Sequence, residues 1–157
     1  MSTAKAITCG CIAIVLTGLA ALGAFGIFIF YVAQEPEGVR ISADGPTEVR
    51  VGETFDLTIT VTNERTDEDV ELSDIDIADE YIDGFTVASI EPKPDSSMHI
   101  PIDNSWSFTF DDGIAPQTTV TYIFKLRAEK PGLHRGDVDV CEGVRFITAM
   151  AQTVVKE

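Results

Sequence analysis

The clearest fold signal lies at residues 54–62, which read TFDLTITVT. Apolar side chains alternate there with threonine and aspartate, and a period of two places successive side chains on opposite faces of an extended strand. The β-branched residues that make up most of the stretch favour the same conformation. The pattern predicts a strand with one face in an apolar core and the other in solvent.

Similar patterns recur on both sides of this strand, and turn residues separate them. The other predicted strands are residues 39–41, 48–51, 70–77, 85–90, 105–110, 118–128, 133–141 and 144–155. No stretch after residue 38 shows the periodicity of an amphipathic helix. A series of short strands without helices predicts an all-β fold, a β-sandwich of antiparallel sheets with Trp106, Phe108 and Phe110 in its core.

Two segments of the chain resemble a known family. Residues 51–63, VGETFDLTITVTN, resemble the opening of bacterial and archaeal immunoglobulin-like surface domains of the CARDB or conserved-repeat type. Residues 114–132 resemble the ending of these domains, although Gln117 stands where a glycine is usual. The resemblance implies an immunoglobulin-like sandwich used for spacing, adhesion or assembly, and it brings no catalytic residues with it.

An uncharged run precedes the strands at residues 7–33 and reads ITCGCIAIVLTGLAALGAFGIFIFYVA. A helix of this length spans about 40 Å, enough to cross a hydrocarbon core of about 30 Å with some tilt. The apolar region of a signal peptide is shorter, about 7–15 residues, and no small-x-small cleavage pattern follows this run. We therefore expect an uncleaved transmembrane helix.

The flanks of this helix predict its orientation. Lys5 precedes the helix and Glu35 and Glu37 follow it, so the positive-inside rule keeps the N-terminus in the cytoplasm. The chain is then a single-pass protein of the cytoplasmic membrane whose C-terminal domain is periplasmic or extracellular. The expected organisation is a cytoplasmic head at 1–6, a transmembrane helix at 7–33, a linker at 34–38 and a β-sandwich at 39–157.

Small residues recur along the predicted helix at Ala13, Thr17 and Ala21, with Gly18 beside them. This spacing lets another helix approach closely, because packing in lipid depends on contact between backbones. It predicts packing against integral membrane subunits, whereas a helix that contacts only membrane lipid is the alternative. Cys9 and Cys11 lie in the same run, and their acylation is the alternative to plain packing.

The chain beyond residue 34 is strongly acidic, since it holds all 26 aspartates and glutamates and ten of the eleven lysines and arginines. This charge repels phosphate backbones, so we expect no nucleic-acid partner. A solvated acidic edge is the plain interpretation. The alternative is a docking face for a basic soluble protein, formed by Glu68, Glu71, Asp79, Glu80 and Asp83.

No motif for catalysis or for a cofactor is present. The sequence has no nucleophile elbow, no glycine-rich phosphate loop and none of the usual haem or iron–sulfur spacings. Calcium takes about six to eight oxygen ligands, and the low-ranking candidates for them are Asp67, Asp69, Asp74 and Asp76. They lack the EF-hand pattern, so the expectation is a protein that is not an enzyme and holds no metal.

These features favour a non-catalytic, single-pass accessory subunit. Its helix packs into a larger integral membrane complex, for example a respiratory or photosynthetic one, and its immunoglobulin-like domain caps that complex on the extracytoplasmic face. The alternative is a membrane-anchored surface module that recognises a soluble basic protein or a cell-wall polymer through its acidic face.

Overall fold

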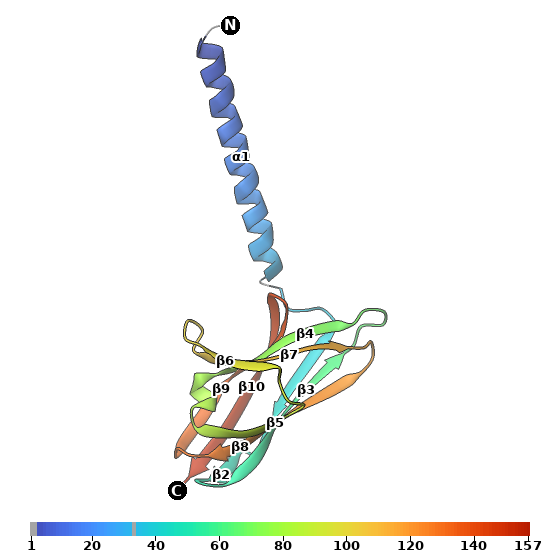
Figure 1. The fold of residues 1–157 in the computed structure, drawn as a ribbon, viewed down its shortest axis with the longest axis vertical. Helices are drawn as coiled ribbons and strands as arrows, with labels where there is room; N and C mark the ends of the chain where they lie inside the picture. Colours follow the sequence, from blue (N-terminus) through green and yellow to red (C-terminus); the bar gives the residue numbers. More distant parts are fainter. Residues whose placement is uncertain (1–2, 33) are drawn as a thin grey trace. The chain divides into compact units, whose positions relative to one another are not determined.

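The structure is a computed structural model of the 157-residue chain, and it describes residues 3–32 and 34–157. Side chains are described for residues 17–31 and 34–157. The chain divides into two compact units, Met1–Gln34 and Glu35–Glu157, which are considered separately (Figure 1).

The first unit contains one helix, α1 (Thr3–Val32). Its described side chains, from residue 17 to residue 31, are all exposed. Among the residues described in full, no helix combines the length and the apolar character that a membrane span requires. Thr17, Gly18 and Ala21 lie on the exposed helix surface, whereas the side chain of Ala13 and residue Ala33 lie outside the described residues. A helix is therefore present where one was expected, and its membrane crossing stays a prediction.

The second unit is a sandwich of two sheets (Figure 1). Hydrogen bonds join neighbouring strands within each sheet. The four-stranded sheet has the order β1 (Val39–Asp44), β3 (Thr54–Asn63), β8 (Thr119–Ala128) and β5 (Phe85–Glu91). The six-stranded sheet has the order β2 (Glu48–Arg50), β10 (Arg145–Lys156), β9 (Gly132–Glu142), β4 (Val70–Ala78), β7 (Ser105–Ile114) and β6 (Ser96–Ile100). The predicted all-β sandwich is confirmed.

Two elements differ from the expectation. A short helix, α2 (Asp79–Ile82), follows β4, and the edge strand β6 follows the prolines at 92 and 94. The sheets are also not entirely antiparallel, because β2 pairs with β10 in parallel. Strand β6 carries mostly exposed side chains. A strand of this kind leaves little apolar alternation in the sequence, which explains why the pattern did not predict it.

The core lies between the two sheets. Phe55, Leu57, Ile59 and Val61 of β3 are buried, as the alternation predicts. Rings from the two sheets meet edge to face: the centroids of Phe108 and Phe124 are 5.0 Å apart, and those of Phe110 and Tyr122 are 4.6 Å apart.

The expected core position of Trp106 is wrong, because this side chain is 37% exposed. Trp106 lies near the start of β7 and pairs with His99 of the edge strand β6. Its ring contacts the His99 ring at a centroid distance of 5.5 Å. Only the outermost strand of the sheet lies beyond this position, so the core does not close over the ring.

Asn63, the last residue of β3, is fully buried and joins three parts of the chain. Its Nδ2 donates hydrogen bonds to the carbonyl oxygens of Glu68 at 2.9 Å and Ile114 at 2.8 Å. Its Oδ1 accepts a bond from the N–H of Arg65 at 2.9 Å. One side chain thus fixes the loop between β3 and β4 against the end of β7.

Arg65 and Glu142 form a second connection at the same end of the sandwich. Two parallel hydrogen bonds of 2.7 and 2.8 Å join the guanidinium to the carboxylate, and the two side chains are only 16% and 13% exposed. Arg65 Nε also donates to the carbonyl oxygen of Glu37 at 2.9 Å. With Pro36 buried, residues 36 and 37 are held as part of the β unit.

Candidate interaction site

The outer face of the six-stranded sheet gathers carboxylates from strands that are distant in sequence. Because β4 pairs with both β7 and β9, Asp76 lies opposite Ser107 on one side and opposite Asp139 on the other. In the neighbouring row, Asp74 lies opposite Thr109 and opposite Cys141 of β9. Cross-strand neighbours of this kind have Cβ atoms about 5 Å apart.

A register shift in β4 turns these aspartates outward. Val70 and Leu72 are buried, and unbroken alternation would also bury residues 74 and 76. The register changes between Leu72 and Asp74, after which the odd-numbered Ile75 and Ile77 are buried instead. The bulge therefore places Asp74 and Asp76 on the outer face.

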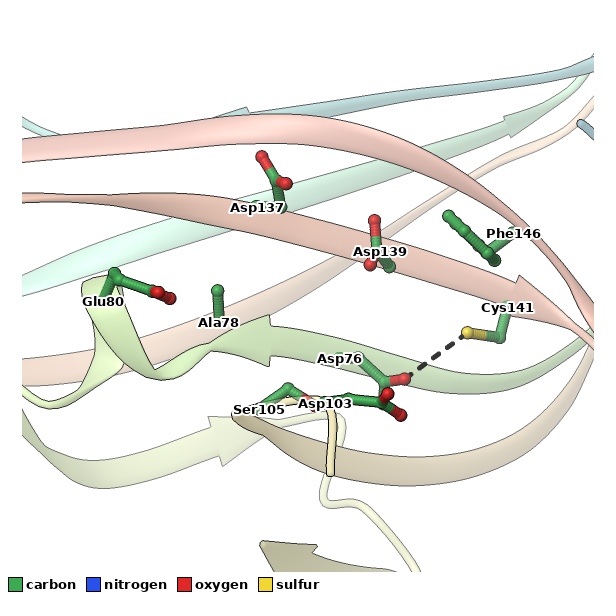
Figure 2. Close-up of a pocket in the computed structure, with 9 residues that line it drawn as sticks. All are labelled: Asp76, Ala78, Glu80, Asp103, Ser105, Asp137, Asp139, Cys141 and Phe146. Atoms are coloured by element: carbon green, nitrogen blue, oxygen red, sulfur yellow. Dashed lines mark hydrogen bonds between the residues drawn. The ribbon is translucent and has the colours of Figure 1, made fainter. Parts of the chain in front are cut away.

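A hollow of about 420 Å³ lies on this face (Figure 2). We call it the acidic pocket. Its lining residues are Asp76, Ala78, Glu80, Asp103, Ser105, Asp137, Asp139, Cys141 and Phe146. Five of these nine side chains are carboxylates, and they come from β4, α2, the turn before β7, and β9. Figure 2 shows Asp76 and Cys141 directed toward each other from adjacent strands.

Negative charges are crowded in the acidic pocket. Burial raises the pKa of Asp76, and the hydrogen bond from Ser107 opposes this effect only in part. Burial also raises the pKa of Asp139, although Thr148 Oγ1 donates a hydrogen bond of 2.5 Å to its Oδ1. In the part of the chain that the structure describes, none of the five pocket carboxylates takes part in an ion pair.

Cys141 acts as a hydrogen-bond donor in this pocket. Burial raises the pKa of its thiol far above the ordinary value, and the nearby carboxylate of Asp76 adds to the shift. The protonated Sγ donates to Asp76 Oδ2 at 3.7 Å. Because the thiolate is the nucleophilic form of cysteine, this side chain is unsuited to covalent chemistry.

Two buried polar atoms at the pocket have no hydrogen-bond partner within the described residues. They are Asp76 Oδ1 and Ser105 Oγ. Ser105 is only 7% exposed, and it lines the pocket. Buried polar atoms are nearly always paired in native proteins, so these two atoms mark a place in the pocket where hydrogen-bond partners are missing.

Of the predicted docking residues, only Glu80 lies in the acidic pocket. Asp79 and Asp83 belong to α2 and its C-terminal end, and Asp79 Oδ2 is hydrogen-bonded to His99 Nε2 at 2.8 Å. Glu68 and Glu71 are exposed near the start of β4, at the opposite end of that strand. The predicted face is therefore divided between two places.

The calcium candidates are also separated. Asp67 and Asp69 lie in the loop before β4, whereas Asp74 and Asp76 lie within the strand. Thr109 Oγ1 donates a hydrogen bond of 2.9 Å to Asp74 Oδ1. Among the described residues, no group of three or more histidine, cysteine, aspartate or glutamate side chains is arranged to hold a metal ion.

The comparison with protein families gives one match. Residues 42–135 match the model described as a BatD DUF11 like domain. The chain belongs to this family. Both segments that resemble immunoglobulin-like surface domains lie inside the matched range, so that resemblance is confirmed. The BatD DUF11-like range includes Asp76, Glu80, Asp103 and Ser105 and ends before Asp137.

Solved structures with a similar fold include the CARDB domain of a Pyrococcus furiosus protein, in a crystal structure with di-metal ions. It is 14% identical over 74% of this chain and 91% of that chain, with a TM-score of 0.48. The solution structure of the same domain is 12% identical to this chain. The match covers 78% of this chain and 97% of that chain, with a TM-score of 0.49. The sulfur carrier protein SoxY from Chlorobium limicola is 14% identical to this chain. The match covers 79% of this chain and 84% of that chain, with a TM-score of 0.43. No curated protein matches the chain.

The substitution Asp76→Asn is expected to stabilise the protein at pH 7. A carboxyl whose pKa is raised by folding is disfavoured as an anion in the folded state, so it lowers stability once the pH exceeds its unfolded pKa of about 3.9. Asparagine carries no charge and escapes this effect. Urea denaturation should show a higher midpoint for the variant at pH 7, with the difference shrinking toward pH 4.

The matched control is Glu71→Gln, which removes one charge from an exposed position on the same strand. We expect its midpoint to stay close to that of the unmodified protein. A lower midpoint for Asp76→Asn at pH 7 would show that the carboxylate stabilises the sheet, contrary to this interpretation.

Proposed function

We propose that the chain is a membrane-anchored, non-catalytic interaction protein. In this proposal α1 crosses the cytoplasmic membrane once, with its N-terminus in the cytoplasm. The β-sandwich lies on the extracytoplasmic side, where it caps a larger integral membrane complex as an accessory subunit. Membership of the BatD DUF11-like family supports a surface domain of this general kind.

The exposed apolar surface of α1 carries this proposal. Leu22, Phe25, Ile27 and Phe30 are 69%, 62%, 73% and 67% exposed. A continuous apolar surface of this kind is stable in lipid or against another protein, and unfavourable in water. The uncharged run at residues 7–33 supports the lipid environment, and the small residues Thr17, Gly18 and Ala21 support contact with another helix.

The short connection between the two units supports capping over capture of distant ligands. Helix α1 ends at Val32, and the fixed part of the β unit includes the buried Pro36. Three residues lie between Val32 and Pro36, so the chain from one to the other extends at most about 14 Å. A partner that it contacts must therefore lie close to the membrane surface.

A second candidate function is favoured by the acidic pocket. A surface module that recognises a soluble basic protein would use five carboxylates that have no cationic partner among the described residues. The two candidates differ in what selects the partner, which is the helix in the first and the sandwich in the second.

Purification in mild detergent distinguishes the two. Tagged full-length protein from its native membrane should carry with it a stoichiometric set of integral membrane subunits, identified by mass spectrometry. Gly18→Leu with Ala21→Leu should reduce their recovery at least tenfold while the protein stays in the membrane fraction. A Cβ at Gly18 would meet no atom within 4 Å, so the change fills only the outer surface of the helix.

The control for this experiment is Leu19→Ile with Leu22→Ile, which keeps the helix apolar and leaves the small residues in place. It should retain the subunits. A chain that extracts as a free monomer, under conditions that keep membrane complexes intact, would contradict the accessory role.

A further inference from the structure

The acidic pocket combines two independent features. It concentrates five carboxylates that have no ion pair within the described residues, and it contains two buried polar atoms without partners, Asp76 Oδ1 and Ser105 Oγ. The first feature alone describes a solvated acidic surface. The second points to a missing ligand, because Ser105 is 7% exposed and its hydroxyl is removed from bulk solvent.

The ligand must be a cation that donates several hydrogen bonds in fixed directions. A divalent metal does not suit the pocket, since no three ligating side chains among the described residues are placed to hold one. A guanidinium group suits it, because its five N–H donors spread in a plane and bind carboxylates in pairs. Guanidinium is also more weakly hydrated than ammonium, so it enters a partly buried site more readily.

Phe146 supplies the apolar side of the site. It lies opposite Cys141 on the neighbouring strand and is 48% exposed. An exposed aromatic ring at the edge of the pocket can pack on the partner that carries the guanidinium. The surrounding face carries further exposed apolar side chains, Met150 at 47% and Met98 at 62%, opposite Asp137 and Ser107. A small cation would leave these uncovered, whereas a polypeptide bearing the guanidinium would bury them.

We propose that the acidic pocket binds an arginine side chain of a partner protein, with the guanidinium held by Asp76, Asp139 and Ser105, while Phe146 packs against the partner beside the arginine. The inference rests on the proposed function in one respect, namely that the β-sandwich contacts another protein. It goes further by naming the face, the pocket and the chemical group that the pocket recognises.

The test uses the full-length protein in detergent micelles and a blocked pentapeptide with one central arginine between serines and leucines. The matched probe carries citrulline, which is neutral and nearly the same shape. Nuclear magnetic resonance titration at 150 mM salt measures both affinities. We expect the arginine peptide to bind at least tenfold more tightly than the citrulline peptide and to shift the backbone resonances of β4 and β9.

Charge-matched variants locate the site. Asp76→Asn with Asp139→Asn should weaken arginine-peptide binding at least tenfold. Glu68→Gln with Glu71→Gln removes the same charge near the other end of β4 and should weaken it less than twofold. Ser105→Ala should weaken it about tenfold, since one charge-assisted hydrogen bond from the guanidinium is lost. Thermal unfolding of each variant verifies that the sandwich is intact.

Three outcomes would overturn the inference. Equal losses in the two charge-matched pairs would show general attraction to an acidic protein. Equal binding of the citrulline peptide would show that the pocket does not recognise a cation. A rise in the melting temperature with Ca²⁺ that disappears in the Asp76→Asn, Asp139→Asn protein would show a metal site instead.

The same variants separate this inference from the proposed function. If the arginine peptide does not bind, and the double asparagine variant keeps all its membrane subunits in mild detergent, the pocket inference is wrong and the accessory role stands. If the peptide binds and the unmodified chain extracts alone, the pocket inference stands and the accessory role is wrong.

Discussion

Asn63→Ala is expected to lower the free energy of unfolding of the β-sandwich by about 3–5 kcal/mol, because three backbone groups lose their partner at once. The carbonyl oxygens of Glu68 and Ile114 and the N–H of Arg65 all bond to this side chain. A buried group left unpaired costs about 1–3 kcal/mol. Since domains are stable by only about 5–15 kcal/mol, the loss is a large share of the total.

The substitution Asn63→Asp tests the direction of these bonds. An aspartate keeps the acceptor for the Arg65 N–H but presents a carboxylate oxygen to two carbonyl oxygens. We expect it to destabilise at pH 7 at least as much as alanine does. Thr62→Val is the neighbouring control, since its hydroxyl is hydrogen-bonded to the Thr119 hydroxyl at an exposed position. Urea denaturation measures all three, and a loss below about 1 kcal/mol for Asn63→Ala would contradict the prediction.

Arg65→Ala is expected to cost about 3–5 kcal/mol at pH 7, because it leaves the poorly exposed carboxylate of Glu142 without its bidentate partner. Arg145 still pairs with this carboxylate at 2.8 Å, which favours the lower part of that range. The change also removes the donor to the Glu37 carbonyl. The backbone N–H of Glu37 should then exchange its hydrogen faster.

The effect of Arg65→Ala should depend on pH. The hydrogen bonds from Arg65 lower the pKa of Glu142, and burial opposes them. A carboxyl with a lowered folded pKa stabilises the protein above its unfolded pKa of about 4.3, and this contribution is lost as the pH falls through the folded value. The difference between variant and unmodified protein is therefore largest at pH 7 and decreases in acid.

The control for this prediction is Arg40→Ala. Arg40 pairs with Glu64 at 2.7 Å, but the two side chains are 74% and 45% exposed. Exposed pairs contribute about 0–1 kcal/mol. Two results would contradict the prediction. One is an equal loss of unfolding free energy in the two arginine variants, and the other is a loss for Arg65→Ala that stays the same between pH 7 and pH 3.

The sequence predicted the fold class because alternation is local. Phe55, Leu57, Ile59 and Val61 are buried as their spacing requires. The turn chemistry and β-branched residues around them gave the strand positions without knowledge of the neighbours. Strand β6 was not predicted, because an edge strand with exposed side chains has no apolar face that the alternation would reveal.

The candidate site depended on information that the sequence does not contain. Asp137 and Asp139 alternate with Val138 and Val140, which predicts that they face outward. Their approach to Asp76 follows only from the pairing of β4 with β9. Alternation assigns residues to faces and says nothing about which strands are adjacent. The docking residues predicted from one acidic segment were therefore divided, and only Glu80 lies in the pocket.

The position of Arg65 also determines how the domain responds to mechanical tension. Glu37 precedes β1 of the four-stranded sheet, whereas Glu142 ends β9 of the six-stranded sheet, and one guanidinium binds both. A pulling force that enters the chain just before β1 is thus passed directly to both sheets. Peeling β1 away from β3 alone would first require the Arg65 bonds to break, so we expect the domain to resist such force as a unit.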